Sequence, residues 1–157
     1  MAITESSSQN KKRIYDPFRQ MWVVATPEEI VRQKLLQKMM QELSYPKELI
    51  SVERALSDLC IHKGNKKTPS RRVDIVCFAR KGPSHFIPLV IIECKESHSL
   101  AKEALSQVKG YNAFLGAPFI AVSSPEGETL AYYLEGKEHF LPYLPPYPAL
   151  LQAVSHG

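Results

Sequence analysis

The chain has 157 residues, of which 44% are hydrophobic and 23% are charged, with a formal net charge of +4. This length and composition indicate one globular domain with a hydrophobic core, and they exclude a low-complexity chain. No run approaches the roughly 18 consecutive apolar residues that a membrane-spanning helix needs, so we expect no membrane partner. The net charge is too small to establish nucleic-acid binding by itself.

The start of the chain and its cysteines predict where the protein works. Residues 1–10 are polar and rich in serine, without the apolar stretch of a secretory signal. Cys60, Cys77 and Cys94 form no closely spaced pair, and the last two lie in strand-like runs. The pattern favours reduced, buried thiols over a disulfide or a zinc site, which predicts a cytoplasmic protein. Residues 1–13 should form a disordered tail.

The first predicted helix begins where Thr26 is followed by Pro27 and then by Glu29. Threonine is a common N-cap, proline fits the first helical position, and a glutamate three residues after the cap completes a capping box. The helix should end near Leu43, because the residue before Pro46 disfavours the helical conformation. Glu29 lies over an apolar line of this helix and should face inward. It either serves the capping box, or reaches a site, or does both.

Strand-like runs follow the first helix. One is expected at residues 49–56, and a polar loop with glycine, asparagine and proline follows at 62–70. Two longer apolar runs lie at residues 71–78 and 88–95, and a turn at 81–83 joins them. Their connection suits an antiparallel pair of strands.

The polar loop and the start of the next strand carry a cluster of basic side chains without an acid between them. The cluster comprises Lys63, Lys66, Lys67, Arg71 and Arg72. A local basic stripe can bind phosphates without a high net charge, which predicts nucleic-acid contacts here. A solvated loop whose lysines serve solubility is the alternative, and the sequence leaves both open.

A second helix is predicted at residues 100–115, with Ser99 as its N-cap and Gly116 at its end. One face of this helix is a mostly apolar stripe. The stripe comprises Leu100, Ala104, Gln107, Tyr111 and Phe114. A buried Gln107 needs hydrogen-bond partners, which a strand end, a substrate or an acidic cluster would supply equally well.

Two further strands are expected at residues 119–122 and 129–134. The resulting order is α-β-β-β-α-β-β, which indicates an α/β fold with a mixed sheet and helices packed on it. The folded domain should cover residues 14–140. Residues 141–157 form a proline-rich extension that should wrap over the body, or act as a polyproline ligand for a partner.

Charged side chains end two of the predicted strands. Asp74 is embedded in an apolar run, where burial of an unpaired carboxylate would be costly. Glu93 and Lys95 close the next run, and they point to the same side because strand side chains alternate with a period of two. Ion pairs at a sheet edge, Glu93 with Arg71 or Lys95 with Glu96, would also explain these charges.

The same residues suit phosphodiester hydrolysis. Magnesium prefers a few carboxylates together with water and substrate oxygens, which Asp74 and Glu93 could provide. The backbone carbonyl of Cys94 is a further candidate ligand, because it lies between the two charged side chains. Lys95 would orient the attacking water or stabilise negative charge.

In combination, these motifs resemble a known family. The resembling segments are Asp16-Pro17, Thr26-Pro27-Glu28-Glu29, Val31-Arg32-Gln33, Tyr45-Pro46-Lys47-Glu48-Leu49-Ile50, Arg72-Val73-Asp74-Ile75-Val76, Ile92-Glu93-Cys94-Lys95, Gln107 with Tyr111, and Gly116-Ala117-Pro118. Together they span most of the predicted domain. The chain is similar to the PD-(D/E)xK nucleases and, more narrowly, to the N-terminal nuclease domain of the type I restriction enzyme R (motor) subunit.

This resemblance implies a restriction-endonuclease-like mixed sheet flanked by helices, and Mg²⁺ or Mn²⁺ as the cofactor. It implies that Asp74 and Glu93 bind the metal and that Lys95 is the catalytic lysine. Glu29 matches the first-helix glutamate of related nucleases. Gln107 and Tyr111 match a motif that lies by the active site and helps to engage DNA.

We therefore predict a Mg²⁺-dependent endonuclease that hydrolyses phosphodiester bonds in DNA. The sequence has no room for the helicase motor of the restriction subunit. The domain would therefore find DNA alone, pair into a homodimer, or use a partner protein for target recognition. The alternatives on the same fold are a non-catalytic nucleic-acid-binding module and a protein-interaction module.

Overall fold

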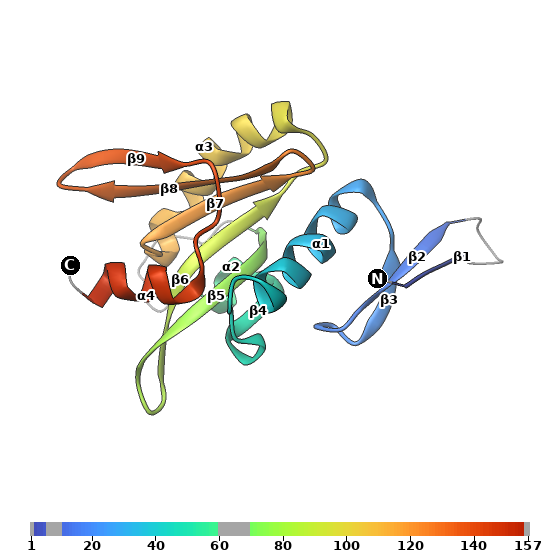
Figure 1. Ribbon diagram of the computed structural model, residues 1–157, viewed down its shortest axis with the longest axis horizontal. Helices are drawn as coiled ribbons and strands as arrows, with labels where there is room; N and C mark the ends of the chain where they lie inside the picture. The colour runs from blue at the N-terminus through green and yellow to red at the C-terminus, as the bar shows by residue number, and fades with distance from the viewer. Residues whose placement is uncertain (1, 6–10, 60–69, 156–157) are drawn as a thin grey trace.

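The computed structural model describes residues 2–5, 11–59 and 70–155 (Figure 1). Its strands are β1 (Ile3–Glu5), β2 (Lys12–Asp16), β3 (Met21–Val24), β4 (Ile50–Ala55), β5 (Arg72–Gly82), β6 (His85–Cys94), β7 (Phe119–Ser124), β8 (Gly127–Leu134) and β9 (Lys137–Leu141). Its helices are α1 (Pro27–Gln41), the 3-10 helix η1 (Lys47–Leu49), α2 (Leu56–Leu59), α3 (His98–Leu115) and α4 (Tyr147–Ser155).

Six of the strands form a mixed sheet in the order β4-β5-β6-β7-β8-β9. Strands β6 and β7 are parallel and joined by α3, whereas the other neighbouring strands are antiparallel. A parallel pair requires such a crossover, and this one brings the ends of β6 and β7 and the start of α3 to one end of the sheet. Strands β1–β3 form a separate antiparallel sheet beyond α1 (Figure 1).

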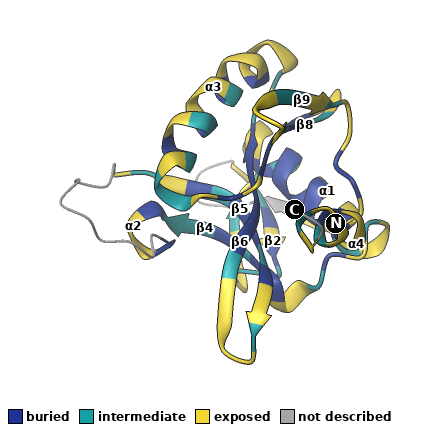
Figure 2. Cartoon of the chain, turned by 90° about the vertical axis from the view of Figure 1, so that its left-hand side faces the viewer, coloured by how far each residue is buried: buried dark blue, intermediate teal, exposed yellow. Residues whose placement is uncertain are grey.

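Helices cover both faces of the six-stranded sheet. Figure 2 shows α1 and α4 on one side and α2 and α3 on the other. Leu36 and Met39 of α1 join one hydrophobic core, while Ala104 and Val108 of α3 join the second. The predicted mixed α/β sheet flanked by helices is therefore present. No helix in the described part of the chain combines the length and apolar character needed to cross a membrane.

Helix α1 begins as its sequence predicts. The hydroxyl of Thr26 accepts a hydrogen bond from the backbone N–H of Glu29 at 3.1 Å, and Pro27 occupies the first turn. The N-cap of α3 is Ser97, which keeps an extended backbone and accepts from the N–H of Leu100, so the assignment of Ser99 is wrong. Gly116 ends that helix in the left-handed conformation, as predicted, with φ of 68°.

The buried face of α3 differs from the predicted stripe. Its buried residues are Ala101, Ala104, Val108 and Tyr111, and Gln107 is exposed. Successive side chains of a helix differ in direction by about 100°. Because the buried face is centred one residue away from the predicted stripe, Gln107 lies on the flank of the helix. The expectation of a buried glutamine that needs partners is therefore wrong, although Gln107 still lies one turn before Tyr111.

Both ends of the chain contain more regular structure than we expected. Residues 3–5 and 12–13 lie in strands, whereas we expected a disordered tail over residues 1–13. Strand β9 was not predicted, although Glu135 and Gly136, with φ of 53° and 75°, form the two-residue turn that leads into it.

The proline-rich end packs on the body, as expected for a wrap, but its last part is helix α4. Pro148 lies in the first turn, where its missing N–H breaks no helical hydrogen bond. Tyr147 and Leu150 are buried in the core, and the hydroxyl of Tyr45 donates to the carbonyl of Pro145 at 2.8 Å. Residues 141–155 therefore share the core of the preceding residues, instead of forming a separate extension.

Candidate active site

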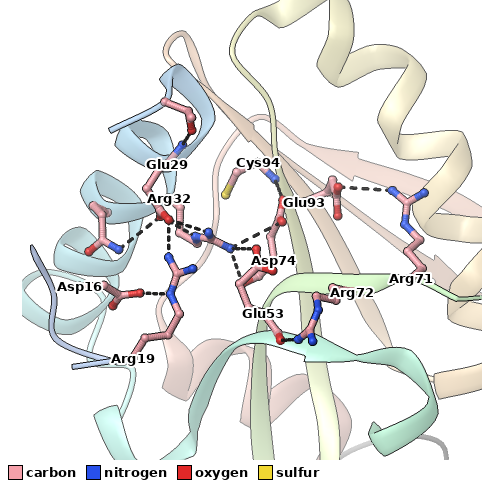
Figure 3. Close-up of polar contacts among 12 residues, drawn as sticks. Asp16, Arg19, Glu29, Arg32, Glu53, Arg71, Arg72, Asp74, Glu93 and Cys94 are labelled. Atoms are coloured by element: carbon pink, nitrogen blue, oxygen red, sulfur yellow. Dashed lines mark hydrogen bonds and ion pairs between the residues drawn. The ribbon is translucent and has the colours of Figure 1, made fainter. Parts of the chain in front are cut away.

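The predicted site lies where β5 begins and β6 ends (Figure 3). Ile75 pairs with Ile92 across these antiparallel strands, so the next residues in this register are Asp74 and Glu93. At this position a side chain takes the place of a backbone hydrogen bond between the two strands. Oδ2 of Asp74 accepts a hydrogen bond from the backbone N–H of Cys94 at 2.7 Å. Asp74 and Glu93 therefore meet at one end of the sheet, as the sequence predicts.

Glu93 faces α3 and is only 6% exposed. Its Oε2 accepts a hydrogen bond from the hydroxyl of Tyr111 at 3.0 Å, and its Oε1 accepts one from Nη2 of Arg71 at 3.3 Å. The guanidinium of Arg71 also stacks over the Tyr111 ring, 4.8 Å from its centroid. The ion pair of Glu93 with Arg71, which the sequence offered as an alternative explanation, is thus part of the same cluster.

Lys95 follows directly after β6 and lies beside Glu93. Its backbone N–H donates to the carbonyl of Ser123 at 2.8 Å, which continues the pairing of β6 with β7 by one residue. Its Nζ lies 3.8 Å from Oε1 of Glu93, and its side chain is 22% exposed. The ammonium group is thus held near Glu93 while it stays accessible to solvent.

The surroundings of the two acids disfavour their charged forms, chiefly because both are withdrawn from water. Burial and then the nearby charge of Glu93 raise the pKa of Asp74 to about 7, against the opposing effects of the Cys94 N–H and of Arg32. Burial also raises the pKa of Glu93, although Arg71, Tyr111 and Lys95 counteract it. A bound cation would relieve this repulsion, and carboxylates with raised pKa values are typical of functional sites.

Glu29 faces inward from the first turn of α1, as predicted, but its carboxylate is already paired. Nε and Nη2 of Arg32 donate to its two oxygens at 2.7 and 2.8 Å, and Nη2 of Arg19 also donates to Oε1. Burial alone would raise the pKa of Glu29, yet the pairing with Arg32 and Arg19 lowers it. Arg19 in turn donates to the buried carboxylate of Asp16.

Sequence reasoning missed Arg32 and Glu53 as members of the cluster. Nη1 of Arg32 donates to Oε1 of Glu53 at 2.5 Å and lies 3.7 Å from Oδ1 of Asp74. Glu29, Arg32, Glu53, Asp74 and Cys94 line a cavity of about 200 Å³ together with Thr26 and Glu28. The available signal was the spacing of three residues between Glu29 and Arg32, which places both on one face of the helix.

The predicted nucleic-acid-binding residues are only partly described. Lys63, Lys66 and Lys67 lie outside the described residues. Arg72 is exposed, and its Nη1 donates to the backbone carbonyl of Glu53 at 2.6 Å. Among the residues that the structure describes, Arg71 Nε is the one buried side-chain nitrogen or oxygen without a hydrogen-bond partner.

The donor atoms at the sheet end fit magnesium in their chemistry. The carboxylates of Asp74 and Glu93 and the carbonyl of Cys94 are hard oxygen donors, and Mg²⁺ is typically held by one or two carboxylates with water and substrate oxygens. Oδ1 of Asp74 lies 3.7 Å from Nη1 of Arg32, too far for a hydrogen bond, and Asp74 lines the cavity. Across the described ranges, no group of three or more His, Cys, Asp or Glu is arranged to hold a metal.

Comparison with known proteins agrees with this geometry. Residues 27–145 match the family model described as the type I restriction enzyme R protein N terminus. The chain belongs to this family. The matched range includes all of the strands and helices that carry the cluster, from α1 to β7. The resemblance drawn from the sequence motifs is thereby confirmed.

A solved structure supports the fold. The chain is similar to the fragment structure of a putative HsdR subunit of a type I restriction enzyme from Vibrio vulnificus YJ016, with a TM-score of 0.55 and 18% sequence identity. The match covers 82% of this chain and 25% of that chain, so this chain spans about a quarter of its length. Comparison with the curated proteins found no match.

Proposed function

We propose that this protein is a nuclease that hydrolyses phosphodiester bonds in DNA with Mg²⁺ or Mn²⁺ as its cofactor. One observation carries the proposal. In a chain of the R-subunit N-terminal family, two carboxylates with raised pKa values, the partly buried Asp74 and the buried Glu93, meet at a sheet end, and the accessible ammonium group of Lys95 lies beside Glu93.

Each residue has a distinct task in this proposal. Asp74, Glu93 and the carbonyl of Cys94 would hold the cation, which supplies Lewis-acid activation of water and of the scissile phosphate. The ammonium group of Lys95 stabilises the negative charge that develops on the phosphate oxygens and orients the attacking water. Tyr111 orients the carboxylate of Glu93 through its hydroxyl group.

DNA contacts surround this centre. Arg71, whose side chain is 33% exposed, would bind the phosphate next to the scissile bond, and Arg72 would extend the basic surface along the start of β5. Arginine suits phosphate because its fork donates two parallel hydrogen bonds. We propose that Lys63, Lys66 and Lys67 continue this surface, and that Gln107 contacts the DNA from the exposed flank of α3.

Target recognition is a separate task. A partner protein would bring the domain to its DNA, as other subunits do in restriction complexes, and pairing into a homodimer is the alternative. The free, buried thiols of Cys77 and Cys94 fit a reducing compartment, and we propose the cytoplasm as the site of action.

Cleavage of supercoiled plasmid tests the proposal. Purified protein should nick or degrade plasmid in Mg²⁺ or Mn²⁺ and leave it intact in EDTA. Asp74→Asn and Glu93→Gln should each abolish cleavage, and Lys95→Met should slow it by roughly 100- to 1,000-fold. Glu103→Gln and Lys102→Met are matched controls, because both side chains lie on the exposed face of α3, and they should cleave as the wild type does. Wild-type cleavage by the folded Asp74, Glu93 and Lys95 variants would refute the site.

A non-catalytic DNA-binding module is the second candidate. The structure offers one observation in its favour, because Arg71 already pairs with Glu93 and Arg32 already faces Asp74. Such a module would bind DNA with an affinity that falls steeply with salt, since phosphate contacts release counterions. Binding of this kind without any cleavage in Mg²⁺ or Mn²⁺ would favour this candidate over the nuclease.

A further inference from the structure

A buried arginine connects helix α1 to the two strands that carry the proposed site. Arg32 is 6% exposed, and its guanidinium group is divided between two layers of the fold. Nε and Nη2 hold the carboxylate of Glu29 on the helix at two points, while Nη1 reaches the sheet. A two-point contact fixes both the position and the plane of a guanidinium group.

On the sheet, Nη1 of Arg32 contacts both β4 and β5. It donates to the carboxylate of Glu53 at 2.5 Å and to the backbone carbonyl of Asp74 at 3.4 Å, and it lies 3.7 Å from the Asp74 carboxylate. The register of β4 with β5 places Glu53 directly opposite Asp74. One guanidinium group therefore touches the residue that we assign to the metal and its neighbour across the strand pair.

The backbone of Glu53 shows that this corner of the site is held under constraint. Glu53 has a φ of 54° within strand β4, a conformation that residues other than glycine rarely adopt. Its carbonyl accepts a hydrogen bond from Arg72, and its carboxylate accepts one from Arg32. Such a conformation persists where surrounding contacts hold it, and here two arginines supply the contacts.

We propose that Arg32 is a positioning residue for Asp74, which holds the metal-binding carboxylate and Glu53 at the cavity through the geometry of its fork. The inference rests on the proposed function, since it concerns the same metal. A counter-ion alone would need only a positive charge. A lysine would supply that charge, but its single ammonium group cannot hold Glu29 at two points and Glu53 at a third.

Calorimetric titration with Mn²⁺ separates the two roles without a need for cleavage. Arg32→Lys keeps the charge and loses the fork, and it should raise the Kd for Mn²⁺ about tenfold, as loss of a group that orients a metal ligand does. Arg54→Lys is the matched control, because Arg54 lies next to Glu53 on β4 and donates to Ser51 at 3.4 Å. This control should bind Mn²⁺ as the wild type does.

The outcomes distinguish this inference from the proposed function. If the wild type binds Mn²⁺ and cleaves DNA, and folded Arg32→Lys binds Mn²⁺ with the same Kd, then only the role of Arg32 is overturned. A wild type that neither binds Mn²⁺ nor cleaves DNA overturns the proposed function and the inference with it. Folding of each variant is checked by circular dichroism and thermal unfolding.

A second variant decides the matter if Arg32→Lys does not fold. Glu53→Asn removes the carboxylate that holds Nη1 on β4, while asparagine tolerates a positive φ better than most residues. The Kd for Mn²⁺ should rise, but by less than about tenfold, because Glu29 still holds the other side of the guanidinium group. A Kd equal to that of the wild type contradicts the proposal.

Discussion

Two acidic regions lie on either side of Arg32, and their charges are balanced in opposite ways. At the start of α1, Arg32 and Arg19 hold Glu29, whose pKa is lowered below its ordinary value. At the sheet end, burial raises the pKa values of Asp74 and Glu93, and the nearby charge of Glu93 raises that of Asp74 further. The comparison teaches that a buried acid with full pairing supports the structure, whereas acids with raised pKa values are typical of a functional site, here the proposed metal site.

The largest expected effect is on the rate of DNA cleavage, and it distinguishes charge stabilisation by Lys95 from metal binding. Lys95→Met should lower the rate of DNA cleavage by roughly 100- to 1,000-fold, as loss of one group that stabilises the transition state does. The Kd for Mn²⁺ should stay near that of the wild type, because Lys95 is not a metal ligand. Single-turnover cleavage and calorimetry measure the two quantities. A large loss of Mn²⁺ affinity would instead show that Lys95 contributes to metal binding.

Removal of the paired carboxylate at the start of α1 should lower the stability of the fold. Glu29→Gln removes the carboxylate that the buried guanidinium group of Arg32 contacts at two points and leaves it only Glu53 as a hydrogen-bonded carboxylate, which should lower the free energy of unfolding by about 3 kcal/mol. Urea unfolding measures it, and Glu28→Gln, an exposed neighbour in the same turn, is the control with little expected change. If Glu29→Gln unfolds like this control, the pairing at the start of α1 contributes little to the fold.

Substitution of Asp74 at the sheet end should instead raise the free energy of unfolding, and only above acidic pH. The pKa of Asp74 rises from 3.8 to about 7 on folding, so the folded protein binds more protons than the unfolded chain between these values. Its stability therefore falls as the pH rises through this window. In EDTA at pH 8, Asp74→Asn should raise the free energy of unfolding by about 2 kcal/mol.

This gain should shrink as the pH is lowered from 7 towards 3.8, the pKa of Asp74 in the unfolded chain, because Asp74 is protonated in both states only below that pH. Urea unfolding at several pH values measures the trend. Asp58→Asn is the control, because this exposed residue of α2 lies away from the cluster. A variant that is less stable than the wild type at pH 8 would show that Asp74 is fully compensated, which removes the contrast with Glu29.

The smallest effect concerns the flank of α3. Gln107 is exposed, so Gln107→Ala should change the free energy of unfolding by less than about 0.5 kcal/mol. Its proposed contact with DNA predicts slower cleavage at unchanged stability. Thermal unfolding and plasmid cleavage test both parts, with Glu103→Ala one turn earlier on the same exposed side as the control. Equal cleavage by the two variants would remove Gln107 from the site.

Local patterns in the sequence were sufficient to predict much of the fold. The cap at Thr26, the end of α3 at Gly116 and the apolar strands around Asp74 and Glu93 depend on neighbouring residues, which the sequence displays directly. The meeting of Asp74 with Glu93 was also predictable, because one short turn joins β5 and β6 and so restricts their register.

Contacts between distant segments were not predictable in the same way. Arg32 and Glu53 are 21 residues apart, and their contact depends on how α1 packs across the sheet and on the unusual φ of Glu53. Which face of α3 is buried depends on how the helix packs against the sheet. The predicted stripe was displaced by one residue from the buried face, and Gln107 is therefore exposed. Strands β1 to β3 pair only with one another, and their short runs carry weak patterns.

Calorimetric titration of Mn²⁺ into wild-type protein and Asp74→Asn, with Glu103→Gln as the control, tests the central claim most directly. The account predicts one binding event in the wild type and in the control, and its loss in Asp74→Asn. Equal Mn²⁺ affinity in all three proteins would contradict the assignment of the sheet end as the metal site.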